Sequence, residues 1–331
     1  MNFRENVLKL LSNKIPQDQK DKILQNMENE AKNNMLYAAY LTYYYHEIEH
    51  IHEKHLKFEK FINKEELKNK ALKDADLAFV TAILMNSSVV FEPNITEMFK
   101  WFELSSELGN PLADFEMGFY HYQLALEGED NQKEKEIGKA VKFFKKAREK
   151  GVVEATLALA ELYVEIDDEK MARKYFNEAI EKGESDGYLG IALIEYDNKN
   201  FEKAKKYLLK SYQADKNRVA AFYLGGMYFE ENENEKGFFY MEESAKQGNT
   251  DAMFDLGVLY LDGELIKKDE KKAFEYFSEA ANKGDAGAQF YLGVFYREGK
   301  VVQKDDEKAR YWFEKSAEQG DEDAIEALET F

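Results

Sequence analysis

The sequence predicts an all-α solenoid, a fold in which pairs of helices stack one after another along the chain. The main observation is an internal repeat, because residues 252–284 share their alanines, glycines and aromatic residues with residues 288–320, 36 positions further on. Self-similarity at a period of 20 to 50 residues is typical of stacked repeats. The second observation is helical spacing, with Ala273, Phe277 and Ala280 at i, i+4 and i+7. Two amphipathic helices of this length cannot bury their apolar faces alone, so we expect the units to stack.

Each unit is expected to hold two helices whose ends are marked by glycine. In the first helix, the small Gly257 allows a partner helix to approach closely, and Tyr260 fills the groove beside it. Gly263 is predicted to end this helix and Gly284 the second one, because glycine adopts the left-handed conformation without a Cβ clash.

The repeated pattern is specific enough to compare with a known family. It reads A-x4-G-x2-Y-x2-G, a polar loop, then K-A-x3-F-x2-A-A-x2-G, and residues 252–284 and 288–320 both carry it. This pattern resembles the Sel1-like repeat, a relative of the tetratricopeptide repeat. The resemblance implies a right-handed superhelix of antiparallel helix pairs that serves as a protein-interaction scaffold.

The same register extends towards the N-terminus and predicts seven repeats. The first unit is read from the residues Leu77, Ala82, Met85 and Ser88. The later units begin at Ala113, Ala155, Gly187, Ala220, Ala252 and Ala288. We therefore predict a helical cap or degenerate repeats over 1–72, seven repeats over 73–323 and a C-terminal half-repeat over 324–331.

The loops between the helices divide the repeats into two kinds. The units that begin at Ala155, Gly187 and Ala220 have 17 residues between their two alanine positions, and the outer units have 21 or more. The middle units thus resemble ordinary tetratricopeptide repeats, and we expect the superhelix pitch to change across 155–250. A long acidic loop is predicted at 127–136, as an insertion within one outer unit.

The first 72 residues follow the repeat pattern only in part. A short first helix is predicted to stop near Pro16, and Ile23 and Met27 then fall at the spacing of a second helix. The next first helix would contain Ala38, Tyr43 and His46, with residues 58–73 as its partner. Terminal repeats are expected to be atypical because one of their faces meets water.

Composition narrows the classes of function. The chain has 331 residues, no cysteine and a net charge of −19, which excludes disulfides and thiolate chemistry and repels phosphate backbones and anionic membranes. The N-terminus lacks the apolar segment of a secretory leader, and the apolar run 77–85 is too short to span a bilayer. We therefore expect a cytoplasmic protein that binds proteins, with no cofactor, no nucleic acid and no membrane as partner.

The segment HEIEH, with His46, Glu47 and His50, is the one candidate for catalysis. Two histidines at i and i+4 on one helix face could reach one zinc ion, and the glutamate could activate a metal-bound water. Four of the five histidines lie within ten residues, which makes a chance match more frequent. No clear motif supplies a third ligand, although Glu65 or Glu66 could serve. We interpret the segment as a structural or solvated helix, and a metal-dependent hydrolase is the alternative function.

Binding residues are carried over from the tetratricopeptide family, whose first helices line a concave groove. The aromatic positions that this places on the groove are Phe79, Phe115, Phe119, Tyr122, Tyr196, Phe222, Phe229, Phe254 and Phe290. The carboxylates among them include Glu161, Asp262 and Glu298. An aromatic ladder edged with carboxylates suits a partner polypeptide with apolar and basic side chains, including a basic protein that an inhibitor or immunity-type scaffold would neutralise. The equally weighted alternative is that these aromatic rings are core between adjacent repeats.

Overall fold

A computed structural model describes residues 3–11, 15–87, 89–128 and 130–331, and these residues form helices and turns without a β-strand. The chain divides into two compact units, 1–175 and 176–331, and each is described by itself. Ser88, the predicted end of the first repeat's first helix, lies outside the described residues. No helix in the described ranges has the length and apolar character needed to cross a membrane.

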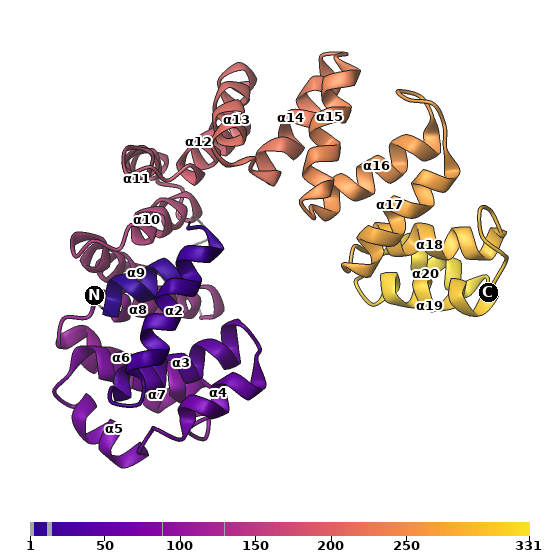
Figure 1. The fold of residues 1–331 in the computed structure, drawn as a ribbon. Coiled ribbons are helices and arrows are strands. Elements are labelled where there is room, and N and C mark those ends of the chain that lie inside the picture. The colour runs from indigo at the N-terminus through magenta and orange to yellow at the C-terminus, as the bar shows by residue number, and fades with distance from the viewer. Residues whose placement is uncertain (1–2, 12–14, 88, 129) are drawn as a thin grey trace. The chain divides into compact units, whose positions relative to one another are not determined.

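Unit 1 contains the N-terminal helices and the first helix pairs (Figure 1). Its elements are α1 (Phe3–Leu11), α2 (Gln17–Glu30), α3 (Met35–Tyr43), the π-helical turn η1 (Tyr44–Ile48), α4 (His52–Glu59), α5 (Lys64–Ala71), α6 (Ala75–Asn86), α7 (Ile95–Glu107), α8 (Pro111–Glu127), α9 (Asp130–Glu149), α10 (Glu154–Glu165) and the first part of α11 (Glu169–Glu181).

Unit 2 begins inside α11 and continues as helix pairs to the end of the described chain. Its further elements are α12 (Asp186–Asp197), α13 (Phe201–Asp215), α14 (Arg218–Glu230), α15 (Asn234–Lys246), α16 (Thr250–Asp262), α17 (Glu270–Asn282), α18 (Ala286–Glu298), α19 (Asp306–Ala317) and α20 (Glu322–Glu329). Helices pack in consecutive pairs, α6 with α7 and α8 with α9 in unit 1, and α12 with α13 through to α18 with α19 in unit 2. The predicted α-solenoid of helix pairs is confirmed.

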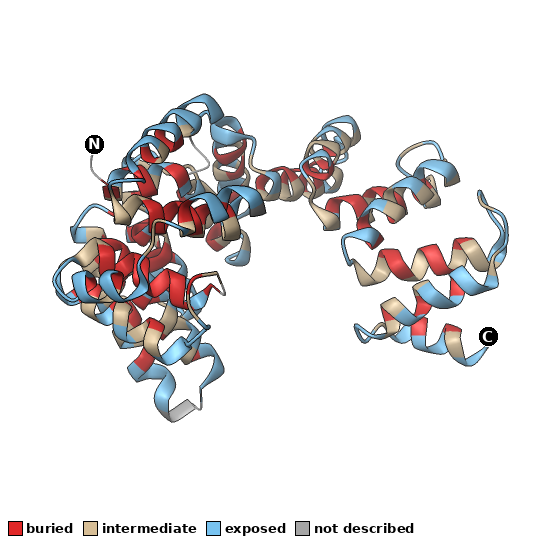
Figure 2. Ribbon diagram, turned by 60° about the horizontal axis from the view of Figure 1, so that its bottom comes forward, coloured by how far each residue is buried: buried red, intermediate tan, exposed pale blue. Residues whose placement is uncertain are grey.

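The close approach within a pair depends on glycine, as predicted. A Cβ built at Gly257 of α16 would lie 2.6 Å from Cε1 of Phe277 in α17, and one at Gly293 would lie 2.5 Å from Cε1 of Phe313. Real Cβ atoms do not approach this closely, so each glycine makes room for the ring of the second helix. Buried residues accordingly follow the faces along which paired helices meet (Figure 2).

Glycine also ends the outer helices. Gly263 and Gly299 follow α16 and α18 with φ of 76° and 68°, in the left-handed region predicted for them, and Gly284 follows α17 with a φ of 100°. In the middle repeats, where the turns after α10, α12 and α14 are short, Lys199 and Asn232 adopt the same conformation with φ of 60° and 62°. The predicted difference in loop length is thus confirmed, and the short turns do without glycine.

The predicted acidic loop at 127–136 is wrong for most of its length. Helix α8 extends to Glu127 and α9 already begins at Asp130. Glu136 is a buried residue of α9, and its Oε2 lies 2.6 Å from Nδ1 of His121, which is also buried. This tertiary pairing, reinforced by Lys139 at 2.8 Å from Glu136 Oε1, holds a polar segment in a helix that composition alone assigns to a loop.

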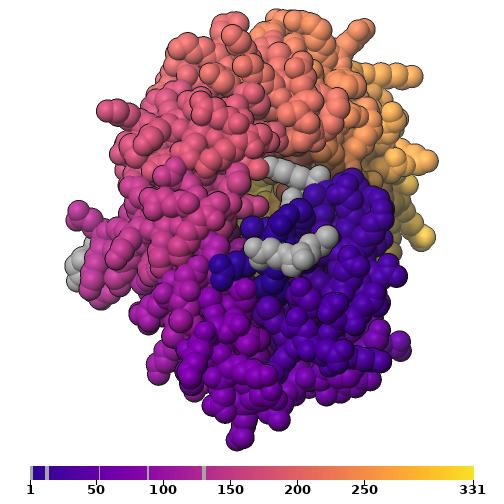
Figure 3. Space-filling model, turned by 60° about the vertical axis from the view of Figure 1, so that its left-hand side comes forward, coloured from indigo at the N-terminus to yellow at the C-terminus, as the bar shows by residue number. Residues whose placement is uncertain are grey.

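The N-terminal region is helical, but its predicted partner helix is wrong. Two short helices, α4 and α5, replace the single helix expected over 58–73, because the chain turns at 60–63 and the side chain of Asn63 caps α5 by accepting from the Glu66 N–H at 3.0 Å. α4 packs on α3, whereas α5 and α3 both pack on α6. The N-terminal helices, indigo in Figure 3, therefore share one core with the repeats of unit 1.

Candidate partner-binding site

The predicted aromatic residues of unit 2 are half-buried rather than hidden in the core. They come from the first helices of successive repeats, namely α12, α14, α16 and α18. Tyr196, Phe222, Phe229, Phe254 and Phe290 all keep part of their surface accessible. They also pack against their neighbours, since the ring centroids of Phe290 and Phe313 are 5.7 Å apart. Each ring thus belongs partly to the contact between repeats and partly to the surface.

Two further tyrosines lie on the same first helices, and sequence reasoning missed them. Tyr223 contacts Tyr196 with the ring centroids 5.0 Å apart, and Tyr291 contacts Phe254 at 6.0 Å. Each follows a predicted residue, Phe222 or Phe290, by one position. Reading one position further along every first helix would have found them.

Carboxylates gather beside these rings on α16 and at the start of α18. Burial, followed by the charges of Asp251 and Asp285, raises the pKa of Asp255 to about 6. Burial also raises the pKa of Asp285, which caps α18 by accepting from the Ala288 N–H at 2.7 Å. Asp255 makes no ion pair with any described residue. Together with Tyr196, Tyr223, Phe254, Phe290 and Tyr291, the carboxylates Asp251 and Asp255 form what we call the unit 2 wall.

Burial and nearby carboxylates also raise the pKa values of two tyrosines of the wall. Burial raises the pKa of Tyr223, followed by the charge of Asp197 and the neighbouring Tyr196 and Asp251. Burial likewise raises the pKa of Tyr291, with Asp262 and Asp323 as further causes. The wall therefore combines aromatic surface with negative potential.

The other predicted carboxylates of unit 2 differ in their availability. Asp262 is exposed at the end of α16. Glu298 is also exposed, but its Oε2 lies 2.7 Å from Nζ of Lys300. An exposed ion pair of this kind is weak, so a partner cation could replace the lysine at small cost.

The prediction that Phe79 is exposed on the groove is wrong. Its side chain is only 4% exposed and packs against Phe102 at a centroid distance of 5.8 Å. Every residue of α6 from Leu77 to Met85 is buried. The reason is that α6 packs against α3 and α5 in addition to its partner α7, so it is covered on faces that later first helices leave open.

The remaining predicted residues of unit 1 lie on α8 and α10. Phe119 is 42% exposed and contacts Phe115 and Phe144 edge-on, at 4.9 and 5.1 Å. Tyr122 is half-buried, and burial raises its pKa, with the charges of Glu165 and Glu161 as further causes. Unit 1 thus also combines aromatic rings with carboxylates.

The premise of the metal-site alternative is wrong, because His46 and His50 do not share a regular helix face. The helix passes through η1 and ends, and His50 has a φ of 53° with its Nδ1 3.1 Å from the carbonyl oxygen of His46. The ring of His46 lies 4.9 Å from that of His55, and its Nδ1 is 2.8 Å from Oε1 of Glu47. The side chain of His52 lies outside the described residues, and within them no group of three histidines or carboxylates is arranged to hold a metal.

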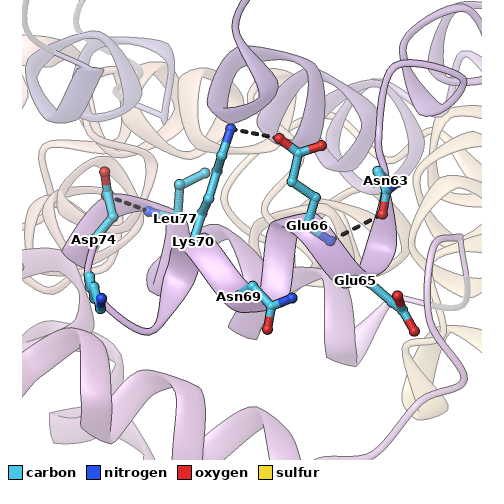
Figure 4. Close-up of a pocket in the computed structure, with 8 residues that line it drawn as sticks. Asn63, Glu65, Glu66, Asn69, Lys70, Asp74 and Leu77 are labelled. Carbon is cyan, nitrogen blue, oxygen red and sulfur yellow. Dashed lines mark hydrogen bonds and ion pairs between the residues drawn. The ribbon is translucent and has the colours of Figure 1, made fainter.

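A large recess between α5 and α6, of about 820 Å³, offers polar groups that the fold already uses (Figure 4). Asn63 caps α5, and Asp74 caps α6 by accepting from the Leu77 N–H at 3.0 Å. Nζ of Lys70 lies 2.7 Å from Oε1 of Glu66. These interactions stabilise the helix ends and one helix face. The polar side chains that line the recess therefore have structural roles, and no ligand is needed to explain them.

The helix pairs define an α-solenoid of the tetratricopeptide-like class, and comparison with known proteins assigns the family. A family model described as the Sel1 repeat matches residues 92–110, 111–152, 157–184, 190–216, 217–249, 250–285 and 286–321. The matches cover more than half of the chain, so the chain belongs to the Sel1 repeat family. Proteins of this family typically serve as protein-interaction scaffolds.

Solved structures agree with this assignment. A Sel1 repeat protein from Oxalobacter formigenes is 19% identical, with a TM-score of 0.64 over 100% of this chain and 94% of its own. The protective antigen c5321 of uropathogenic Escherichia coli, with an SLR fold, is 25% identical over 80% of this chain, with a TM-score of 0.60. The chain spans 58% of the length of that antigen.

An immunity protein of Pseudomonas aeruginosa, PA5088, is 21% identical over 62% of this chain and 83% of its own. Its TM-score is 0.45. The search of curated proteins found no match.

Proposed function

We propose that this chain is a non-catalytic interaction scaffold in the cytoplasm, and that the unit 2 wall binds a partner polypeptide with basic and apolar side chains. The observation that carries the proposal is Asp255, a carboxylate whose charged form is disfavoured by burial and by two neighbouring carboxylates. A cation from a partner would relieve this electrostatic cost. Phe254, the preceding residue on α16, and Tyr291, whose ring contacts that of Phe254, offer the surfaces on which aliphatic or aromatic side chains pack.

The domain division belongs to the same proposal. Residues 1–72 act as a helical cap, 73–323 as the repeats that present the binding surface, and 324–331 as a half-repeat that covers the last pair. The packing of α3 and α5 on α6, and of α20 on α19, supports this division. Right-handed stacking of the pairs follows from the family resemblance.

The net charge favours one particular form of the proposal. At −19, the chain attracts basic proteins over distances of about a Debye length, which raises the rate of encounter. Neutralisation of a basic protein by an inhibitor or immunity-type scaffold is therefore one specific version, and the identity of a captured partner tests it.

The test is an affinity capture from lysate of the source cells, read by mass spectrometry. The wild type is compared with the double variant Phe254→Ala/Phe290→Ala and with Asp251→Asn/Asp255→Asn. We expect one basic protein to be captured by the wild type and lost from both variants. Phe239→Ala is the matched aromatic control, because Phe239 lies in unit 2 and is 52% exposed.

Two outcomes contradict the proposal. One is a partner that is retained by both wall variants, which would place binding elsewhere. The other is unfolding of Phe254→Ala/Phe290→Ala in circular dichroism with full capture by Asp251→Asn/Asp255→Asn, which would make the rings core and the carboxylates irrelevant.

A further inference from the structure

A separate recess of about 240 Å³ opens in unit 1, between α3, α6, α7 and α8. Its walls are mainly apolar and aromatic, and they include Tyr43, Ile83, Met98, Phe99 and Phe119. Phe99 stacks on Tyr120 with the ring centroids 3.4 Å apart, which fixes one side of the recess. The hollow is therefore built from several elements of one core and is not a gap between loose side chains.

One charged side chain, Glu116, lines this recess. No lysine, arginine or histidine lines it, and Glu116 makes no ion pair with any described residue. The apolar residues packed around Glu116 raise the pKa of its carboxyl above the ordinary glutamate value. The side chain of Glu116 is exposed at the mouth of the recess, so a ligand can reach its carboxylate. The amides of Asn86 and Gln123 also line the recess and supply further hydrogen-bond acceptors.

We propose that this recess takes the side chain of a lysine or arginine from a protein partner, with its cationic head on Glu116 and its aliphatic stem between Phe99 and Phe119. The proposal rests on the proposed scaffold function and adds a second anchor point, in unit 1. A cation complements this site, since Glu116 is the one charged side chain among the lining residues and no basic residue accompanies it there. Long basic side chains suit such a hollow because their stems are apolar and their heads are charged.

The chemistry of the recess disfavours the other occupants. An apolar side chain would remove water from Glu116 and leave its charge unpaired. An anion would meet Glu116 itself, and the pKa of Tyr43 is already raised by burial and by the charges of Glu116 and Glu47. A metal ion would need more ligands than one carboxylate offers.

The experiment uses the full chain labelled at the methyl groups of isoleucine and methionine, because Ile83 and Met98 line the recess. The probe is acetyl-Gly-Lys-Gly-amide, and acetyl-Gly-norleucine-Gly-amide is its neutral counterpart. Titration followed by methyl NMR is expected to give saturable shifts of Ile83 and Met98, with the lysine probe bound about tenfold more tightly. Glu116→Gln is expected to remove this preference, and Glu103→Gln, an exposed glutamate of α7 outside the recess, to keep it.

Equal affinity for the two probes in the wild type would overturn the inference, and this comparison requires no variant to fold. A preference that survives Glu116→Gln would overturn it as well. Tighter binding of cadaverine than of the lysine probe would assign the recess to a free amine instead of a partner side chain. Failure of the scaffold proposal is a different observation, since it is read from capture by the unit 2 wall variants.

Discussion

Gly257 and Gly226 both lie inside first helices of unit 2, yet they meet opposite surroundings. A Cβ at Gly257 would lie within 2.9 Å of three ring atoms of Phe277, whereas a Cβ at Gly226 would meet nothing within 4 Å. The repeat pattern alone predicts the close contact at Gly257, because Gly293 recurs at the same position 36 residues later. It says nothing about Gly226, which has no counterpart there. The role of a glycine thus follows from its neighbours in space.

This contrast gives a matched pair of variants. Gly257→Val should overpack the contact with Phe277 and lower the free energy of unfolding by about 1–3 kcal/mol or more. Gly226→Ala should raise the free energy of unfolding by up to about 1 kcal/mol, because alanine is the better helix former where space is open. Urea denaturation measures both. An unchanged midpoint for Gly257→Val would contradict the packing role.

Asp255 makes the stability of unit 2 depend on pH. Its folded pKa of about 6 lies above the ordinary aspartate value, so the folded state binds more protons than the unfolded state between about pH 4 and 6. Stability is therefore lost as the pH rises through this window. Asp255→Asn should raise the free energy of unfolding at pH 7.5 by about 1 kcal/mol, after allowance for solvent screening of this half-exposed group.

The same substitution should have little effect at pH 4, where Asp255 is protonated in the folded state. Thermal unfolding at both pH values measures the difference. Glu326→Gln, an exposed change on α20, is the control and should show no such dependence on pH. A gain in stability that is equal at the two pH values would show that charge is not its cause.

At the scale of one element, the short turns of the middle repeats carry residues in a glycine-like conformation. Lys199 has a φ of 60° between α12 and α13, where the outer repeats place glycine. Lys199→Gly should therefore raise the free energy of unfolding by about 0.5–1 kcal/mol. Lys203→Gly, four residues on and inside α13, should lower it by about 1 kcal/mol. Chemical denaturation measures both, and a loss of stability for Lys199→Gly would contradict the strain argument.

The helix ends show where sequence reasoning works. Gly263 and Gly284 were predictable because their conformational preference is local. The start of α9 was not, because Glu136 is held by His121, a contact across 15 positions of the chain. Likewise, the break before α5 depends on the cap at Asn63. The sequence around Asn63 is as polar as an exposed helix, so its composition does not reveal the break.

At the scale of the whole molecule, the repeat pattern predicted the helix pairs, whereas packing between distant helices decides how much of each first helix is exposed. Phe254 and Phe290 are half-buried, whereas Phe79 is buried because the N-terminal helices pack on α6. No repeat motif marks those helices, so the sequence could not show that they close this end of the surface. The expected change of superhelix pitch across 155–250 stays a prediction.

Stacked repeats should also limit how far a local defect spreads. Because each repeat contacts mainly its neighbours, the stability of a solenoid is close to a sum of repeat and interface terms. Gly293→Val places a side chain against Phe313 and should therefore weaken α18 and α19 together with the adjoining α17 and α20. Amide exchange in these helices should accelerate by about tenfold or more, since 1.4 kcal/mol corresponds to a factor of ten. Exchange in α6 to α9 should keep its wild-type rate. In the control Gly226→Ala, no helix should exchange faster than in the wild type. Hydrogen exchange read by mass spectrometry resolves these segments, and uniform acceleration from α6 to α20 would mean that the chain unfolds as one cooperative block.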